Sequence, residues 1–416
     1  MAVFICRSAR VGCAVNRARN VAIQFCAAFA FGKFFRTYLS THHTMIWAIL
    51  ILFAAYLVAM AIVIYGFKKV SLFKAEEFAA KSHFSIVIPF RNEAENLPVL
   101  LKTVENLNYP SKMFEIIFVN DASEDNSEAI ISEAIEKSRF SIKIFQNKRI
   151  SNSPKKDAIS EAIKNSNFEW IVTTDADCEL PKNWLKTLDA FIQKNNPVMV
   201  CGPVIYKSNG NFIESFQQLD GFSLQAVTIG SFGMRRPLLC NGANLAYRKD
   251  AFLEVNGFSE NDHIASGDDI FLLEKMKKRF PRQVQFFKSK QVIVSTKPQS
   301  TWKNVLNQRI RWASKTSKQK STLSLLLGGL VFLVNISVLA IPFLMVFHSE
   351  NALLYASLLF IKIIMDYIVL QQAAIFFGRK IMFWKFLWLP FVYASIVVFV
   401  VFGSFEGNYS WKGRTF

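Results

Sequence analysis

The chain has 416 residues, of which 52% are hydrophobic and 19% are charged, and its net charge is +18. This composition is too apolar for a soluble enzyme and too charged for a membrane bundle alone, so we expect membrane segments together with a polar domain. The excess of Lys and Arg does not indicate nucleic-acid binding, because the sequence has no zinc-finger or RNA-recognition pattern and basic residues commonly flank membrane segments. The six cysteines form no C-x-x-C pair, which favours a reducing compartment over a disulfide framework.

Residues 1–44 are an atypical N-terminal extension, rich in Arg and without any acidic residue. One interpretation is a targeting presequence, since such segments are basic and poor in acidic residues. The interpretation that we favour is that the native chain begins at Met45 and that the preceding residues are upstream sequence read as protein.

Residues 45–67 are predicted to form a transmembrane helix. Ile46–Phe67 carries no charge and has the length, roughly 20 residues, that a bilayer requires. Lys68 and Lys69 follow at once, and positive residues stay on the cytoplasmic side of a membrane. The polar domain that follows is therefore expected in the cytoplasm.

Residues 83–300 alternate short apolar strands with helical periods, which predicts an α/β domain with a mostly parallel, Rossmann-like sheet. Ligands of such sheets bind at the carboxyl ends of the strands. No Gly-x-Gly-x-x-Gly follows the first strand and no Gly-Lys-Ser/Thr phosphate loop occurs, which disfavours a dinucleotide oxidoreductase and a P-loop NTPase. The expected strands are Ser85–Phe90, Phe114–Asn120, Ile142–Gln146 and Glu169–Thr174, and the expected helices are Ala94–Leu107, Asn126–Lys137 and Lys155–Asn165.

Two carboxylates, Asp175 and Asp177, follow the fourth strand. Because they are two residues apart in an extended segment, they can aim at one point. Mg²⁺ or Mn²⁺ takes one or two protein carboxylates and completes its shell with substrate phosphates, so the pair is a candidate metal site. Solvated strand ends also often carry such a pair, and the isolated motif does not decide between the two.

Seven motifs, ordered along the chain, decide in favour of function. They are Ile86–Glu93 (IVIPFRNE), Val119–Asp121 (VND), Lys155, Thr174–Asp177 (TDAD), Asn241–Asn244 (NGAN), Gly267–Asp269 (GDD) and Gln308–Trp312 (QRIRW). Together they resemble a family 2 glycosyltransferase with a GT-A fold. The match is most similar to the membrane-embedded branch, which includes cellulose, hyaluronan and poly-N-acetylglucosamine synthases and ceramide glucosyltransferases.

The resemblance implies a donor site for a nucleotide sugar. It gives Asp121 the uracil or ribose of a UDP-sugar, brings Lys155 to the nucleotide end, and gives Asp175 and Asp177 the metal and the diphosphate, with Asp177 the surer ligand. The alternatives are a helix cap for Asp121 and a solvated charge pair for Lys155 and its neighbour Lys156. Pro89, Arg91 and Glu93 complete the donor-binding set, with a first-turn helix acid as the alternative for Glu93.

The resemblance also implies the general base. Asp269 is expected to deprotonate the acceptor hydroxyl, with Asp268 in support, and direct attack opposite the departing UDP inverts the anomeric centre. Helix capping could account for part of this acidity, and His263 is a less favoured base.

Two further stretches are assigned to the acceptor and the diphosphate. Asn241, Gly242 and Asn244 form a small-residue turn that lets backbone approach a sugar, or else a plain tight turn. Residues 301–318 alternate apolar and basic residues, which predicts an amphipathic helix on the membrane surface. Gln308, Arg311 and Trp312 lie on it, where an interfacial anchor of Trp and Arg is the alternative to a sugar site.

Residues 323–405 are predicted to contain two or three transmembrane helices. Leu323–Phe347 and Ala352–Phe377 each suffice to span, whereas Phe383–Phe405 either spans or is interfacial. Lys362 and Asp366 are four residues apart and are expected to pair or to line an acceptor path. Residues 406–416 form a basic C-terminal tail.

The expected protein is an inverting glycosyltransferase with a cytoplasmic GT-A domain flanked by transmembrane helices, and the bacterial inner membrane is the favoured location. Its cofactor is Mg²⁺ or Mn²⁺, its donor a UDP-hexose or UDP-N-acetylhexosamine, and its acceptor a growing polysaccharide. The first alternative is a glycolipid-forming transferase with a lipid acceptor. The second is a non-catalytic scaffold among the partner subunits of an envelope polysaccharide assembly.

Overall fold

The structure is a computed structural model, and it describes residues 44–75, 79–208, 210–262, 264, 266–316, 321–405, 410–411 and 414–415. The atypical segment 1–43 and the less favoured base His263 lie outside the described residues. The chain divides into two compact units, residues 1–55 and 56–416, and the fold below is that of the second unit.

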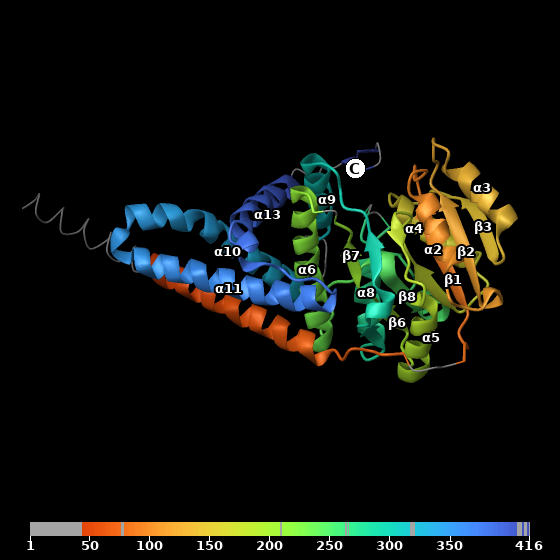
Figure 1. Cartoon of the computed structure of the whole chain (residues 1–416), viewed down its shortest axis with the longest axis horizontal. Helices are drawn as coiled ribbons and strands as arrows, with labels where there is room; N and C mark the ends of the chain where they lie inside the picture. Colours follow the sequence, from red (N-terminus) through yellow and green to blue (C-terminus); the bar gives the residue numbers. More distant parts are fainter. Residues whose placement is uncertain are drawn as a thin grey trace, which may run out of the picture. The chain divides into compact units, whose positions relative to one another are not determined.

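A seven-stranded sheet in the order β3-β2-β1-β4-β8-β6-β9 is the centre of the polar domain (Figure 1). Strands β3, β2, β1 and β4 run parallel, and β8 runs antiparallel to both of its neighbours. The predicted α/β fold with a mostly parallel sheet is therefore confirmed. The strands are β1 (Phe84–Phe90), β2 (Phe114–Asn120), β3 (Ser141–Gln146), β4 (Trp170–Thr173), β6 (Met199–Cys201), β8 (Leu245–Arg248) and β9 (Val284–Phe286).

The central strands are buried along almost their whole length because they are covered on both faces. Every residue of β2 is buried, and so is all of β1 except Pro89. Continuous burial of this kind is typical of parallel sheets. The helices of this domain are α2 (Leu97–Glu105), α3 (Ser127–Lys137), α4 (Pro154–Lys164), α5 (Trp184–Asn195), α7 (Lys249–Glu254) and α8 (Asp268–Arg279).

A smaller sheet lies beside the carboxyl end of β4. It joins β5 (Cys178–Glu179), β10 (Val294–Thr296) and β7 (Val204–Tyr206), with β10 in the middle. Because β5 follows the two carboxylates Asp175 and Asp177 directly, this sheet fixes the far side of their loop.

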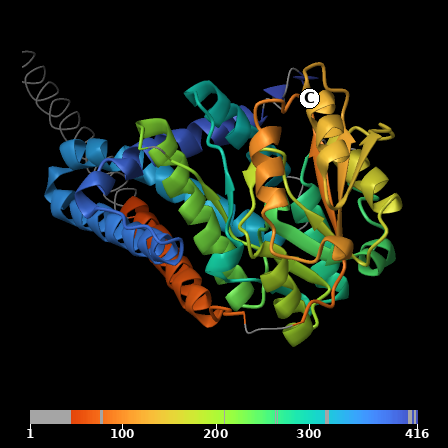
Figure 2. The same ribbon diagram turned by 45° about the vertical axis from the view of Figure 1, so that its right-hand side comes forward.

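Helix α6 (Phe212–Gly233) was not predicted. It begins at Asn211, whose side chain accepts a hydrogen bond from the Glu214 N–H at 2.8 Å, as an N-cap does. It packs against β7 and against α11 (Ala352–Phe376), so it joins the polar domain to the apolar helices (Figures 1 and 2).

A contact of glycines brings α6 close to the helix Thr44–Lys69. A Cβ atom on Gly233 would lie 1.8 Å from the carbonyl oxygen of Gly66, and one on Gly230 would lie 2.7 Å from that of Val63. Only residues without a side chain allow two backbones to approach so closely.

Within the part of the chain that the structure describes, three helices are long and apolar enough to cross a membrane: Thr44–Lys69, Thr322–Phe347 (α10) and Ser349–Phe376, which includes α11. Helix α13 (Leu389–Phe405) is apolar but shorter, and it packs against α10 and against α9 (Trp302–Thr316). The described end of the chain adds α12 (Phe383–Phe386) and a ladder of β11 (Ser410–Trp411) with β12 (Arg414–Thr415).

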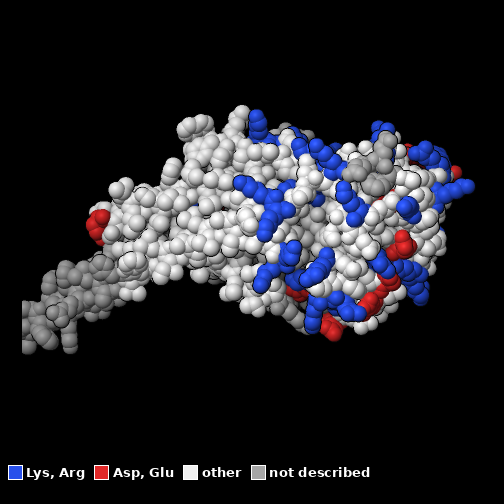
Figure 3. Space-filling view, turned by 90° about the horizontal axis from the view of Figure 1, so that it is seen from below, with Lys and Arg blue, Asp and Glu red and all other residues white. Residues whose placement is uncertain are grey.

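Charged side chains are distributed as a membrane boundary requires. The apolar helices are almost free of them, and Lys and Arg gather where these helices meet the polar domain (Figure 3). Lys362 is the buried exception, and it forms the predicted ion pair with Asp366 at 2.7 Å. Tyr56 donates a hydrogen bond of 2.6 Å to the same carboxylate, so the ion pair also ties α11 to the helix Thr44–Lys69.

Candidate active site

A cavity of about 850 Å³ opens at the carboxyl ends of the strands. It is lined by residues that follow β1, β2 and β4, by the first turns of α4 and α8, and by α6, α9, α10 and α13. Nearly all of the predicted site residues line it: Pro89, Arg91, Glu93, Asp121, Lys155, Asp175, Asp177, Asn241, Gly242, Asp268, Asp269, Gln308, Arg311 and Trp312.

Lys155 connects the two groups of acidic residues in this cavity. Its Nζ lies 2.7 Å from Asp175 Oδ1 and 3.5 Å from Asp268 Oδ2. Burial alone would lower the pKa of this ammonium, but the nearby carboxylates of Asp175, Asp268 and Asp269 outweigh it and raise the pKa. Lys155 is therefore a permanent cation, and the solvated-pair interpretation is wrong for it.

Asp268 and Asp269 occupy the first turn of α8, where the N-terminal end of a helix favours negative charge. Gly267 before them adopts a left-handed conformation with φ of 87°. The Asp269 carboxylate accepts hydrogen bonds from the N–H groups of Gly242 at 3.2 Å and Ile270 at 2.8 Å. A Cβ atom on Gly242 would lie 3.0 Å from Asp268 Oδ2, so glycine is what lets this turn approach the acids.

Lys156 holds the loop that precedes Asp268 and Asp269. It is 1% exposed, and its Nζ donates to the carbonyl oxygens of Asn261 at 2.6 Å and Ile264 at 3.0 Å. Those carbonyls belong to the loop that leads into Gly267. Lys156 is therefore not half of a solvated charge pair, as considered from the sequence, but a buried tie that positions the acidic turn.

Asp121 lies at the end of β2, 5% exposed. Its Oδ1 accepts hydrogen bonds from Arg149 Nε at 2.7 Å and from Asn147 Nδ2 at 2.8 Å. Arg91 donates to the carbonyl oxygens of Asp121, at 2.9 Å, and of Ala122. These contacts hold the loop after β2 open toward the cavity, and Arg91 acts there mainly as a support for the loop.

Glu93 combines the two interpretations given to it. Its carboxylate accepts a hydrogen bond of 2.6 Å from Asn96, the residue before α2, and its side chain also lines the cavity. It therefore stabilises the start of the helix at the edge of the site.

Asn244 is placed differently from the prediction, because its side chain does not line the cavity. It is 6% exposed, and it accepts a hydrogen bond from Trp184 and donates to the carbonyl oxygens of Pro203 and Val292 at 2.9 and 2.8 Å. An amide whose groups are satisfied inside the core cannot bind a sugar, so Asn244 positions the turn rather than the acceptor.

Helix α9 lines the cavity with Gln308, Arg311 and Trp312, as predicted. It also brings Arg309, which was not selected from the sequence although it lies inside the same motif. Arg309 and Asp220 of α6 form a buried ion pair with an Nη2–Oδ2 distance of 2.5 Å. The guanidinium also lies 4.2 Å from the centre of the Trp312 ring, so the indole is packed between protein and cavity.

The donor set fits a divalent cation that relies on its substrate for ligands. Among the residues that the structure describes, no group of three or more His, Cys, Asp or Glu side chains gathers in a geometry for a metal ion. Asp175 and Asp177 nevertheless line the same cavity, both partly exposed. Two carboxylates suffice for Mg²⁺ or Mn²⁺ when phosphate oxygens complete the shell.

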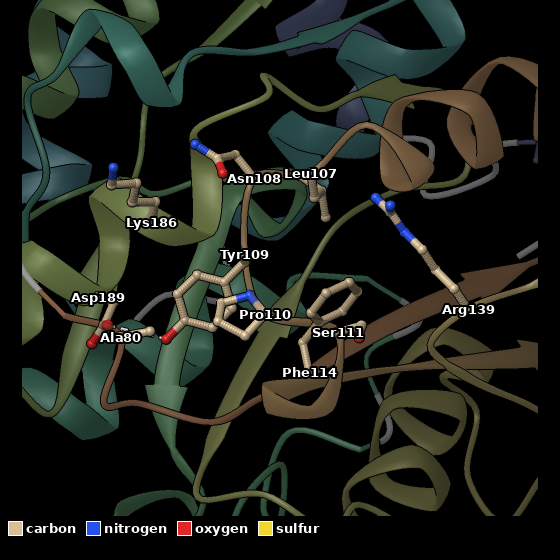
Figure 4. A pocket seen from close by; sticks show the side chains of 10 residues that line it. All are labelled: Ala80, Leu107, Asn108, Tyr109, Pro110, Ser111, Phe114, Arg139, Lys186 and Asp189. Carbon is tan, nitrogen blue, oxygen red and sulfur yellow. Dashed lines mark hydrogen bonds between the residues drawn. The ribbon is translucent and has the colours of Figure 1, made fainter.

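A second cavity, of about 420 Å³, lies near the amino ends of β1 and β2 (Figure 4). Tyr109 points across it to Asp189, to which it donates a hydrogen bond of 3.0 Å, and Asp189 also accepts from the N–H groups of Lys81 and Ser82. None of the predicted site residues lines this cavity. The Asp189 carboxylate already accepts three hydrogen bonds from the protein. The larger cavity is therefore the candidate active site.

Comparison with known proteins agrees with this geometry. Residues 85–255 match the model of glycosyl transferase family 2. Among curated proteins, glycosyltransferase AglE of Haloferax volcanii is 25% identical over 189 residues, which are 45% of this chain and 58% of that protein. Poly-beta-1,6-N-acetyl-D-glucosamine synthase of Staphylococcus epidermidis is 26% identical over 255 residues, which are 59% of this chain and 57% of the synthase. The matches thus span somewhat more than half the length of these relatives.

Solved structures share the fold. The mannosyltransferase PcManGT of Pyrobaculum calidifontis, in complex with GDP-Man and Mn²⁺, superposes with a TM-score of 0.51 over 86% of this chain and 97% of that chain, at 13% identity. With the mostly parallel sheet and the three apolar helices among the described residues, these findings confirm the resemblance seen in the sequence: residues 85–255 form a glycosyltransferase family 2 domain with a GT-A fold.

Proposed function

We propose that this chain is an inverting glycosyltransferase that moves a hexose or N-acetylhexosamine from a UDP-sugar to a hydroxyl group of a membrane-proximal acceptor. The observation that carries the proposal is the convergence of the donor-side carboxylates Asp175 and Asp177 and the base candidate Asp269 on one cavity. These residues are separated by some ninety positions in the sequence, and a scaffold without catalysis would have no need to keep them together.

On the donor side, Asp121 would accept hydrogen bonds from the base or ribose, and Lys155 would meet the diphosphate. Asp175 and Asp177 would hold Mg²⁺ or Mn²⁺, which when bound supplies positive charge to the departing nucleoside diphosphate. The Mn²⁺ and GDP-Man in the PcManGT complex support this class of donor and ion, although that protein is named for a guanosine donor.

On the acceptor side, Asp269 is the stronger candidate base. Its carboxylate is oriented by two backbone N–H groups and is partly exposed to the cavity, whereas Asp268 is buried beside Lys155. The base takes the proton of the acceptor hydroxyl as its oxygen bonds to the anomeric carbon and the bond from that carbon to the diphosphate breaks. Attack from the face opposite the leaving group inverts the configuration.

The acceptor would reach this base from the side of the cavity that α6, α9, α10 and α13 form. With Lys68 and Lys69 at the end of the first helix, this supports an integral membrane protein whose catalytic domain faces the cytoplasm, the bacterial inner membrane being the favoured site. A growing polysaccharide and a lipid both suit a transferase of this arrangement.

The test is nucleotide release by the detergent-solubilised full chain, measured against a panel of UDP- and GDP-sugars with Mg²⁺, Mn²⁺ or EDTA and with or without membrane lipid. We expect one donor to be turned over with either ion and none with EDTA. Product size then separates a polymer ladder from a single-sugar glycolipid. Absence of nucleotide release and of donor binding under every condition would favour the scaffold interpretation.

A further inference from the structure

The cavity continues from the carboxylates into the apolar helices. We define its aliphatic arm as the lining contributed by α10 and α13, which consists of Val331, Tyr393, Ile396, Val397, Val400 and Val401. Five of these six side chains are aliphatic. Val331 belongs to a helix long and apolar enough to span a membrane, so the arm reaches the depth at which lipid chains lie.

Such a lining discriminates between the two classes of acceptor. A glycan carries hydroxyl groups around every ring, and each one that leaves water needs a hydrogen-bond partner. The arm offers one phenol for this purpose. A hydrocarbon chain needs no such partners and gains from burial against aliphatic side chains.

A polar station lines the same cavity. It consists of Arg309 of α9 and Asp220 of α6, which form the ion pair described above. The guanidinium of Arg309 also lies 6.0 Å from the centre of the Tyr206 ring.

This station presents buried donors that the protein does not fully satisfy. Arg309 is 8% exposed and contacts Asp220 and Tyr206, but its Nε and Nη1 complete no hydrogen bond of good geometry with the described part of the chain. Buried donors that face a cavity indicate a ligand that accepts hydrogen bonds at this position.

The charge of the station indicates which polar group. Asp220 already neutralises Arg309, so the station has no net charge with which to bind a phosphate or another anion on the acceptor. A neutral carbonyl, such as that of an ester or an amide, accepts hydrogen bonds from a guanidinium without adding charge.

We propose that the acceptor is a neutral lipid alcohol, in which the reacting hydroxyl stands next to an ester or amide carbonyl. The hydroxyl faces Asp269, the carbonyl accepts from Arg309, and the hydrocarbon chain fills the aliphatic arm. This inference rests on the proposed function for the identity of the reacting hydroxyl, but lipid binding in the arm can be measured without any donor.

The experiment is native mass spectrometry of the full chain released from detergent micelles, with 1,2-dioleoylglycerol as the probe and dioleoyl phosphatidic acid and a soluble N-acetylglucosamine tetramer as comparisons. We expect one bound dioleoylglycerol, less phosphatidic acid and no retained tetramer. In Val331→Trp the bound dioleoylglycerol should fall roughly tenfold or more, because the indole fills the arm. Val346→Trp is the matched control, since Val346 lies on the same helix but is 76% exposed.

A further variant tests the polar station without leaving a buried charge unpaired. Arg309→Lys keeps a cation beside Asp220 but loses the planar set of donors. It should weaken dioleoylglycerol binding several-fold at an unchanged unfolding temperature, an effect that a merely structural role would not give.

The inference is overturned if Val331→Trp binds dioleoylglycerol as well as Val346→Trp does, if phosphatidic acid binds as well as the neutral lipid, or if the tetramer is retained. Donor binding is followed separately, as the shift of unfolding temperature by UDP-sugars with Mn²⁺. Lipid binding without any donor binding would contradict the proposed function alone, and donor binding without lipid in the arm would contradict this inference alone.

Discussion

The ammonium of Lys155 lies 2.7 Å from the carboxylate of Asp175, in the place where the donor set would receive a metal ion. The ammonium and a metal ion bound in the proposed site would therefore compete for the same oxygen. Lys155→Met should raise the affinity for Mn²⁺ several-fold in the absence of nucleotide, because an opposing charge is removed from the carboxylates. The same change should weaken binding of the nucleotide sugar, whose diphosphate loses a cation.

Manganese binding is measured by the electron paramagnetic resonance signal of free Mn²⁺. Lys148→Met is the control, because Lys148 is an exposed lysine that pairs with Glu161 at 3.3 Å, away from the carboxylates of the cavity. Equal Mn²⁺ affinity in Lys155→Met and the unchanged protein would mean that the ion does not use Asp175.

Substitution of the proposed base should separate chemistry from binding. Asp269→Asn keeps the size of the side chain and an oxygen for one of the two N–H groups, of Gly242 and Ile270, that donate to the carboxylate, but it cannot take a proton. Transfer should fall roughly 10²–10⁴-fold, the usual contribution of a general base, while donor affinity changes little. Full transfer by this variant would remove Asp269 from the mechanism.

Asp177→Ala should produce the opposite pattern. Donor binding that depends on Mn²⁺ should weaken, whereas the smaller donor affinity measured in EDTA should stay the same, because only the metal-dependent part passes through this carboxylate. Titrations with UDP-sugar at fixed Mn²⁺ give both values. An equal loss with and without the ion would indicate that Asp177 contacts the donor directly.

The glycine contact between α6 and the helix Thr44–Lys69 predicts a stability difference. Gly233→Ala places a methyl group against the Gly66 carbonyl oxygen and should destabilise the protein by about 1–3 kcal/mol. The control is Gly328→Ala in α10, where nothing lies within 4 Å of the added carbon, and a gain of about 0.5–1 kcal/mol is expected from helix propensity. Thermal unfolding in detergent compares the two variants. Similar unfolding midpoints would show that the two helices can move apart at this contact without loss of stability.

Lys288 predicts a dependence of stability on pH. Its Nζ donates to the carbonyl oxygens of Phe67 at 2.8 Å and Val70 at 3.0 Å, and burial lowers its pKa to about 8. In the unfolded chain a lysine has a pKa of about 10.4, so between these values the unfolded state holds more protons than the folded state. The free energy of unfolding should therefore rise with pH from about 8 to about 10. This gain is lost again as the pH falls back through 8.

The measurement is the unfolding midpoint across that range for the unchanged protein and for Lys288→Met, which has no group to titrate there. A matching rise in both proteins would assign the effect to other lysines. If the unfolding midpoint of the unchanged protein instead falls as the pH rises, the two carbonyl acceptors stabilise the ammonium more than burial destabilises it.

The βα part of the fold could be predicted because its signals are local. The strands β1 and β2 are mostly apolar runs, and their predicted bounds differ from the structure by at most one residue. Asp175 and Asp177 could be selected because they follow a strand of a sheet whose ligands bind at the carboxyl ends, and Asp269 because the motif Gly267–Asp269 belongs to the family resemblance.

Helix α6 could not be predicted in the same way. It packs against β7 and α11 and also lines the cavity, so its apolar residues do not form a single stripe. The polar residues Asp220 and Gln225 interrupt them further. Arg309 was overlooked for a related reason, since the burial that makes it informative depends on its partner Asp220, some ninety residues away. Asn244 was misassigned because the sequence does not show that Trp184 and two carbonyl groups occupy its amide.

The walls of the large cavity come from many stretches of the chain. Residues that follow β1, β2 and β4 include the proposed donor-binding side chains, whereas α9, α10 and α13 line another part of the cavity. A recombinant fragment cut before Trp302 would keep the matched domain but lose these helices, leaving the carboxylates open to bulk water. Such a fragment should waste activated sugar by hydrolysis, and an exchange of α9, α10 and α13 between relatives should change what is glycosylated without changing which sugar is used.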